Sequence, residues 1–238
     1  MGIVNLIDAR IASAAPEADI PLRARELQLR LWNQKRELCR GRSPVEPVEL
    51  FDPGMALSLL GFEVITDQCL GEMNYDGRRI QVAGTIDLKG KVVRISPNLT
   101  FEELRFTTAH ELGHAVLHTD MDTLHRDRSL TGPVLRRDRR EVQADQYASC
   151  FLMPERWVRN RFRQCFGMDR FELTEDTAFG LGCLNIDKAR LRYRSPRDLS
   201  QALARSCNFL GQSFDSLSKY FHVSPTAMAI RLNELGLV

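Results

Sequence analysis

The sequence predicts an α+β fold in which a small antiparallel sheet precedes a mostly buried helix and the C-terminal third is helical. Residues 79 to 95 carry apolar side chains at alternating positions around an Asp-Leu-Lys-Gly sequence, which is typical of two antiparallel strands joined by a hairpin turn. The apolar residues of 101 to 118 have helical spacing, and Thr100 and Glu103 are placed as a capping box before them. The C-terminal third continues the helical pattern with short interruptions.

Length and composition indicate a globular chain with more than one domain. Its 238 residues are 43% hydrophobic and 27% charged, which is ordinary for a protein that buries a core. We expect an N-terminal helical extension and linker over 1–47, the α+β domain over 48–166 and a helical C-terminal domain over 167–238. The net charge of +2 is too small to indicate binding to nucleic acid or to a membrane by itself.

The chain is predicted to be a cytoplasmic protein without a membrane segment. No apolar run reaches the length of a membrane span, and the N-terminus lacks a basic segment before an apolar core, so we expect no secretory signal. The six cysteines are scattered singly, which is typical of free thiols in an intracellular protein.

Before the sheet, the sequence predicts short packing elements. Residues 20 to 40 place leucines on one side and arginines on the other, which favours a packing helix with a solvated basic face over a nucleic-acid-binding arm. Residues 43 to 47 have the composition of a linker. Residues 53 to 60 predict a short helix that ends at Gly61, and 62 to 66 predict a strand.

The helix predicted at 101 to 118 contains the sequence His-Glu-Leu-Gly-His. Residues i and i+4 of an α-helix share a face, so His110 and His114 can reach one metal ion. Glu111 then lies beside that ion, where a carboxylate can accept a proton from a metal-bound water. Gly113 lacks a side chain and would let another element pack closely against this helix. The alternative is a buried helix with two hydrogen-bonded core histidines.

A second helical segment offers a third ligand. A catalytic zinc site uses three protein ligands and leaves one position for water. The apolar spacing of 141 to 153 predicts a helix on which Glu141 and Asp145 share a face. We predict that Glu141 is the third ligand and that Asp145 accepts the Nδ1–H of a ligating histidine, with His110 as the first choice. The alternative is two solvated acids at helical spacing. Three other histidines compete weakly for the ligand role: His118, His125 and His222.

These segments resemble the ImmA/IrrE family of zinc metallo-endopeptidases, whose active sites are gluzincin-like. Residues 105–118 read Arg-Phe-Thr-Thr-Ala-His-Glu-Leu-Gly-His-Ala-Val-Leu-His, which is close to one signature of that family. Residues 141–154 are similar to a second signature, which begins with Glu and ends with Leu-Met-Pro. Residues 221–237 resemble the helical segment that follows the peptidase core. The resemblance covers about residues 50–160 well and the C-terminal segment less closely.

The resemblance implies a zincin-like core in which the small sheet packs on the metal-bearing helix. It implies one Zn²⁺ per chain, held by His110, His114 and Glu141, with Glu111 as the catalytic base. It also implies that the substrate is a helix-turn-helix repressor, often encoded beside the peptidase, whose cleavage derepresses genes of mobile elements or stress responses. The chain departs from the family pattern at Tyr147, where a Phe is usual.

Three features bear on how a substrate would bind. The oxyanion of the transition state needs a second donor, for which His118 and Tyr147 are candidates, although each can instead be a core residue. An edge strand can pair with an extended substrate, and we expect residues 92–96 or the strand paired to them to lie nearest the cleft. Residues 119–140 are rich in arginine and longer than the family pattern; we interpret them as a solvated segment, with a lid or an exosite for an acidic substrate as the alternative.

The last segments predict a helix, a tight turn and a helix, which resembles a helix-turn-helix. Residues 213–220 form the first helix and 224–235 the second, which Ser224 caps ahead of a proline. The second helix carries one positive residue, Arg231, and its first turns lack the Asn, Gln or Lys on which base readout usually depends. A packing role is therefore favoured, and DNA binding stays an open alternative.

Two other functions remain as alternatives to a peptidase. One is a transcription regulator that binds DNA and uses zinc as a structural element. The other is a non-catalytic sensor that binds a repressor without cutting it. Glu111 argues against both, because a structural site has no need of a base and fills its fourth position with protein.

Overall fold

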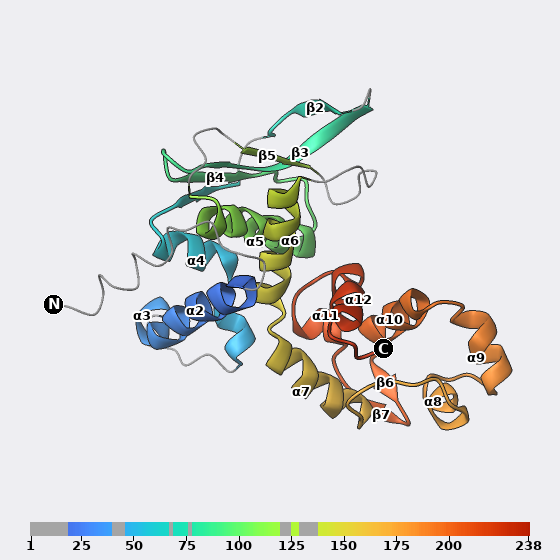
Figure 1. The fold of residues 1–238 in the computed structure, drawn as a ribbon. Helices are drawn as coiled ribbons and strands as arrows, with labels where there is room; N and C mark the ends of the chain where they lie inside the picture. The colour runs from blue at the N-terminus through green and yellow to red at the C-terminus, as the bar shows by residue number, and fades with distance from the viewer. Residues whose placement is uncertain (1–18, 40–45, 67–68, 76–77, 120–124, 129–137) are drawn as a thin grey trace. The chain divides into compact units, whose positions relative to one another are not determined.

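The computed structural model describes residues 19–39, 46–66, 69–75, 78–119, 125–128 and 138–238 (Figure 1). They form a mixed α and β structure with small sheets and many helices, as predicted. The chain divides into two compact units, Met1–Leu152 and Met153–Val238. The predicted domain limits at 47 and 166 stay a prediction, and part of the N-terminal extension and linker lies outside the described residues.

The first unit begins with short helices, and the longest of these, α2, packs through the predicted leucine face. The elements are α2 (Ile20–Asn33), α3 (Lys35–Leu38), the 3₁₀ turn η2 (Pro47–Leu50) and α4 (Pro53–Leu59). On α2, Ala24, Leu27 and Leu31 are buried. Gln28 of the same face donates from Nε2 to the carbonyl oxygen of Phe151 at 2.8 Å and to that of Cys150 at 3.2 Å. Helix α2 therefore satisfies carbonyl groups in the last turn of helix α6 (Arg139–Leu152), which otherwise lack helical partners.

The sheet of the first unit has the predicted hairpin at its centre. Its strands are β1 (Glu63–Ile65), β2 (Glu72–Tyr75), β3 (Arg78–Asp87), β4 (Val92–Ile95) and β5 (His125–Arg128). The order is β1-β4-β3-β2, with β5 also paired to β3. In the turn between β3 and β4, the Asp87 side chain accepts a hydrogen bond from the Gly90 amide at 2.8 Å. This bond pins the turn that the sequence predicted.

The sheet is mixed, so the prediction of a purely antiparallel sheet was wrong in one pairing. Strand β1 runs parallel to β4, with Glu63 opposite Val92, while the other pairings are antiparallel. The reason is that β2 and β3 intervene in the chain, so β1 reaches β4 by a crossover rather than by a hairpin.

Helix α5 (Phe101–Leu117) lies against the sheet and is buried over most of its length (Figure 1). The capping box at its start is present, because Thr100 Oγ1 accepts from the Glu103 amide and the Glu103 carboxylate accepts from the Thr100 amide. Val82, Ile86 and Val93 of the strands are buried, as expected for a sheet that packs a helix on one face.

Helix α6 (Arg139–Leu152) crosses α5 at close range. A Cβ added to Gly113 of α5 would lie 3.0 Å from both the Cα and the carbonyl oxygen of Ala144, and 3.2 Å from the Tyr147 Cβ. Glycine is thus required for the two helix backbones to approach this closely, as the sequence indicated. The crossing determines which residues of α6 face α5.

The second unit contains α7 (Glu155–Phe166), α8 (Glu175–Gly180), α9 (Ile186–Arg192), α10 (Pro196–Arg205), β6 (Asn208–Phe209), β7 (Gln212–Ser213), α11 (Leu217–Tyr220) and α12 (Pro225–Glu234). Edge-to-face contacts join Phe166 to Phe171, Phe209 and Phe214, with ring centroids 5.4–5.8 Å apart. These rings form one aromatic cluster in the second unit. Among the described residues, no helix is long and apolar enough to cross a membrane.

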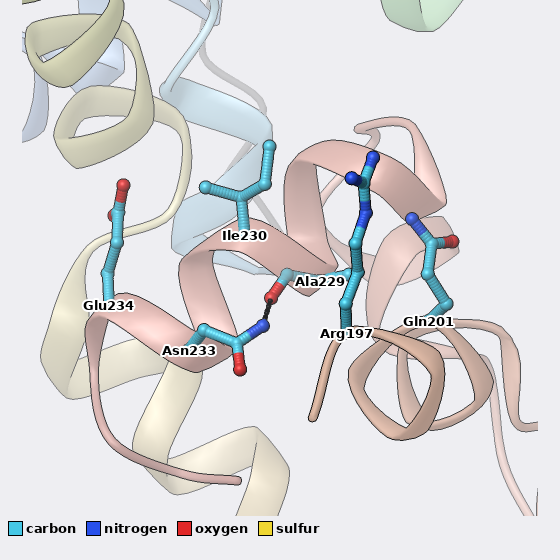
Figure 2. Close-up of a pocket in the computed structure, with 6 residues that line it drawn as sticks. All are labelled: Arg197, Gln201, Ala229, Ile230, Asn233 and Glu234. Carbon is cyan, nitrogen blue, oxygen red and sulfur yellow. Dashed lines mark hydrogen bonds between the residues drawn. The ribbon is translucent and has the colours of Figure 1, made fainter. Parts of the chain in front are cut away.

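The predicted second helix of the helix-turn-helix is α12. Its positive residue, Arg231, is buried within the second unit. Arg231 is 7% exposed and donates from Nε to the carbonyl oxygen of Met153 at 3.1 Å. The groove between α10 and α12 is lined by Arg197 and Gln201 of α10 and by Ala229, Ile230, Asn233 and Glu234 of α12, so α12 itself contributes no positive side chain to it (Figure 2). This placement favours a packing role for α12, and the helix-turn-helix assignment stays a prediction.

Candidate metal centre

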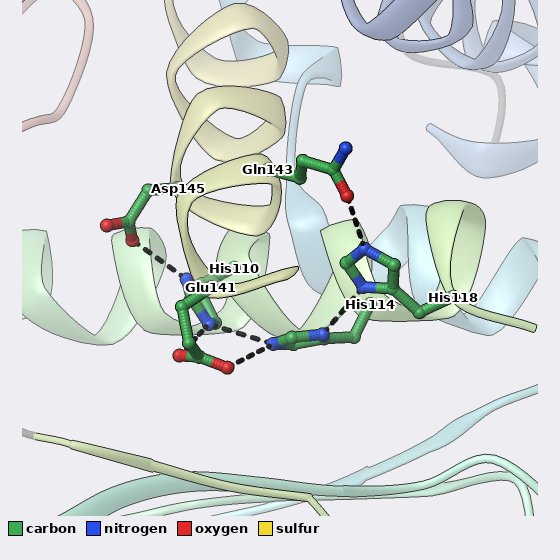
Figure 3. Close-up of polar contacts among 6 residues, drawn as sticks. All are labelled: His110, His114, His118, Glu141, Gln143 and Asp145. Atoms are coloured by element: carbon green, nitrogen blue, oxygen red, sulfur yellow. Dashed lines mark hydrogen bonds and ion pairs between the residues drawn. The ribbon is translucent and has the colours of Figure 1, made fainter. Parts of the chain in front are cut away.

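The imidazole rings of the two predicted histidine ligands on α5 lie next to one another. His110 and His114 are 2% and 0% exposed, and their Nε2 atoms lie 3.0 Å apart (Figure 3). One helical turn separates them, as the sequence spacing required.

The crossing of α5 and α6 brings a carboxylate to the same point. Glu141, in the first turn of α6, places Oε2 3.4 Å from the His110 Nε2 and Oε1 3.4 Å from the His114 Nε2 (Figure 3). Among the described residues, His110, His114 and Glu141 form a cluster whose donor atoms all lie within 4.8 Å of one another. The structure thus brings together the three predicted ligands.

The spacing of these donors fits a tetrahedral metal ion. Zinc binds imidazole nitrogen and carboxylate oxygen at about 2.0–2.2 Å, so two donors at a tetrahedral angle lie about 3.3–3.5 Å apart. The nitrogen pair is at 3.0 Å and both nitrogen–oxygen pairs are at 3.4 Å, close to the edges of such a tetrahedron. Two imidazoles and one carboxylate are also the donor set of a known class of catalytic zinc sites.

Asp145 determines the tautomer of the first histidine. Its Oδ1 lies 2.9 Å from the His110 Nδ1 (Figure 3). A carboxylate oxygen accepts, so Nδ1 carries the proton and Nε2 keeps its lone pair for the cluster. Asp145 and Glu141 are one turn apart on α6, so the same face that supplies the third donor also orients a histidine.

The side chain of Glu111 extends from α5 toward strand β3. Glu111 is 0% exposed. A Cβ added to Gly84 of β3 would lie 2.5 Å from the Glu111 Oε1 and 2.9 Å from the Thr107 Cγ2. The missing side chain of Gly84 therefore makes the space that this carboxylate occupies. Gly84 was not predicted to belong to the site; its signal in the sequence is a glycine inside an alternating strand, which often marks a close approach of another segment.

The two predicted oxyanion donors have different surroundings. His118 follows the last residue of α5, is 4% exposed and contacts His114 through its ring nitrogen at 2.9 Å. Tyr147 is fully buried and stacks on Phe151 with ring centroids 6.2 Å apart. Burial raises the pKa of the Tyr147 hydroxyl. Of the nearby charged groups on α2, Arg23 lowers this pKa and Glu26 raises it. These positions favour packing and support roles, and contact with a substrate stays a prediction.

The strand nearest Glu111 is β3, and its partner β4 is not an edge. Residues 92–96 were expected to lie nearest the cleft or to pair with the strand that does; β4 is paired on both sides, to β1 and to β3. On its other side β3 pairs with β5, where Gly84 lies opposite Asp127. Among the described strands β5 is therefore outermost next to Glu111.

Most of the arginine-rich stretch 119–140 lies outside the described residues.

Comparisons with known proteins point to a peptidase family. Residues 63–178 match the family model Peptidase_M78, described as an IrrE N-terminal-like domain. This range runs from β1 to α8 and includes the whole of α5 and α6. The chain is also 35% identical over 116 residues to "Uncharacterized immunity region protein 2" of Bacillus phage phi105. That match covers 48% of this chain and 63% of the phage protein. No solved structure matches the chain.

Proposed function

Residues 63–178 belong to the IrrE N-terminal-like peptidase family, and from this premise we propose that the protein is a zinc-dependent endopeptidase that cleaves a helix-turn-helix repressor. The observation that carries the proposal is the cluster of His110, His114 and Glu141, whose donor atoms have tetrahedral spacing. The family match supports a peptidase, and the donor set within the matched residues supports a bound metal ion.

The proposed roles follow from where each side chain lies. His110 and His114 would hold the ion through Nε2, and Glu141 would hold it through its carboxylate. When bound, zinc would supply a Lewis acid and would lower the pKa of a water toward about 7. Glu111 is the base: its carboxylate accepts the proton of the attacking water and delivers it to the nitrogen of the leaving amine.

Burial and close packing prepare Glu111 for that role. The side chain lies where Gly84 leaves room for it, so the adjacent strand limits the rotamers that the carboxylate can adopt. His110 is oriented by Asp145 at 2.9 Å, which keeps its Nε2 directed at the cluster. The proposed ligands and base are therefore supported by Gly84 of β3 and by Asp145 of α6.

A protein substrate is supported by the family and by the phage relative. That relative is named for an immunity region of a phage. We infer that the substrate here is a repressor in the cytoplasm, whose cleavage would relieve repression of genes of a mobile element or of a stress response. An extended segment of the substrate would add to the sheet on the side where β5 is outermost, next to Glu111.

A cleavage assay tests the proposal. Purified protein with zinc is incubated with the repressor-like protein encoded nearest its gene, and fragments are identified by mass spectrometry. We expect a discrete cut by the unaltered protein, no cut by Glu111→Gln, and normal cleavage by Glu102→Gln. Glu102 is the matched control, because it lies in the first turn of α5, away from the metal cluster.

Two results would support the alternatives instead. Release of the repressor without a cut, equal in the unaltered protein and in Glu111→Gln, would indicate a non-catalytic sensor. A salt-dependent affinity for duplex DNA that is lost when Arg231 and Lys219 are replaced would indicate a DNA-binding regulator. The buried position of Arg231, which donates to Met153, argues against the second result.

A further inference from the structure

The second histidine of the cluster is held by a chain of two side chains. His114 Nδ1 lies 2.9 Å from His118 Nδ1, and His118 Nε2 lies 3.1 Å from Gln143 Oε1 (Figure 3). His118 stands at the C-terminal end of α5 and is 4% exposed, while Gln143 lies on α6 two residues after Glu141. The chain therefore runs from α6 through α5 to the back of the His114 ring.

The direction of the protons in this chain is decided by Gln143. An amide oxygen only accepts, so His118 Nε2 must carry a hydrogen. In a neutral imidazole the other nitrogen is then an acceptor, which makes His118 Nδ1 the acceptor for His114. His114 Nδ1 therefore donates, and its Nε2 keeps a lone pair that points at Nε2 of His110 and at Glu141. The opposite order would place a proton on His114 Nε2 and block it as a donor to a metal.

We propose that His118 and Gln143 are positioning residues that hold His114 in its metal-binding tautomer. The inference rests on the proposed function, because it takes the cluster as the zinc site. His118 is not itself a ligand in this arrangement, since its Nδ1 meets the side of the His114 ring that is turned away from the cluster. In this proposal His118 orients a ligand, and its contact with a substrate stays a prediction.

The two histidines are thus supported in different ways. His110 donates to the carboxylate of Asp145, whereas His114 donates to a neutral imidazole that is itself held by an amide. A neutral chain orients the ring without bringing a further negative charge to a site that already has Glu141, Asp145 and Glu111. Fewer negative charges around the ion favour a stronger Lewis acid.

Zinc affinity measures this role without reference to catalysis. The affinity is determined by competition with a chromophoric chelator for the unaltered protein, His118→Leu and Gln143→Leu. We expect both variants to bind zinc about 10- to 100-fold more weakly, as is usual when a side chain that orients a ligand is removed. Gln146→Leu is the matched control, because Gln146 is exposed on the same helix; its affinity should be unchanged.

A conservative variant separates positioning from packing. Asparagine at residue 118 can place an amide oxygen near the position of the imidazole Nδ1, so His118→Asn should restore much of the affinity lost in His118→Leu. In addition, ¹⁵N NMR of the histidine side chains should show the Nδ1–H tautomer of His114 in the zinc-loaded protein. Thermal unfolding of each metal-free variant checks that it folds. If His118→Leu does not fold, Gln143→Leu still tests the positioning role.

The outcomes distinguish this inference from the proposed function. If the unaltered protein binds one zinc and both leucine variants bind it as tightly as Gln146→Leu, the positioning role is wrong and the zinc site stands. An Nε2–H tautomer of His114 would overturn the inference in the same way. If the unaltered protein binds no zinc, the proposed function fails, and this inference fails with it.

Discussion

Replacing Gly84 with alanine tests whether strand β3, which lies beside α5, positions the proposed base Glu111. The added Cβ would lie 2.5 Å from the Glu111 Oε1, whereas ordinary contacts begin at 3.4 Å. The carboxylate must therefore retreat by about 0.9 Å, or β3 must move away from α5. A misplacement of about 1 Å at a reacting group can reduce the rate on the order of 100-fold, which corresponds to about 2.7 kcal/mol of activation free energy.

The assay compares kcat for cleavage with zinc affinity in the same preparation. We expect kcat of Gly84→Ala to fall by about two orders of magnitude while zinc affinity stays within a few-fold, because Gly84 contacts Glu111 and Thr107 rather than the three donors. Contact with the Thr107 methyl at 2.9 Å also adds an overpacking cost of about 1–3 kcal/mol, so activity is measured well below the unfolding midpoint.

Gly90→Ala is the matched control for this variant. There the added Cβ would also lie 2.5 Å from a carboxylate oxygen, that of Asp87, but on the exposed hairpin turn between β3 and β4. Activity should be retained in Gly90→Ala. Full activity in Gly84→Ala would refute the reasoning, because the base would then not depend on the space that glycine leaves.

Three further variants test the supports of the site. Asp145→Asn should weaken zinc binding about 10-fold, because His110 keeps an acceptor but loses a charged one; chelator competition measures the loss. Gly113→Ala gains about 1 kcal/mol of helix propensity, yet overpacking against the α6 backbone costs about 1–3 kcal/mol, so a lower melting temperature is expected. Arg105→Met removes hydrogen bonds to Asp52 and to the carbonyl oxygen of Phe51, and urea unfolding should report a loss of about 1–3 kcal/mol.

Features that depend on neighbouring residues in the chain were predictable from the sequence. The capping box of α5, the hairpin turn and the shared face of His110 and His114 follow from spacings of three or four residues. The pairing of Asp145 with His110 was also anticipated, because a ligating histidine needs an acceptor and α6 offers two acids on one face.

Features that depend on which segments meet were not predictable. The approach of Gly84 to Glu111 requires the register of β3 against α5, and alternation along the strand does not contain it. The parallel pairing of β1 with β4 results from a crossover whose course is decided by packing. His118 lies at the end of α5, where the direction of the side chain depends on its partner Gln143 on another helix.

Anomalous diffraction at the zinc absorption edge, from crystals of the zinc-loaded protein, tests the central claim most directly. The account predicts one peak per chain, about 2.0–2.2 Å from the Nε2 atoms of His110 and His114 and from a carboxylate oxygen of Glu141. No fourth protein side chain should contact that peak. A peak held by other side chains, or a fourth protein ligand that closes the site, would contradict a catalytic zinc centre.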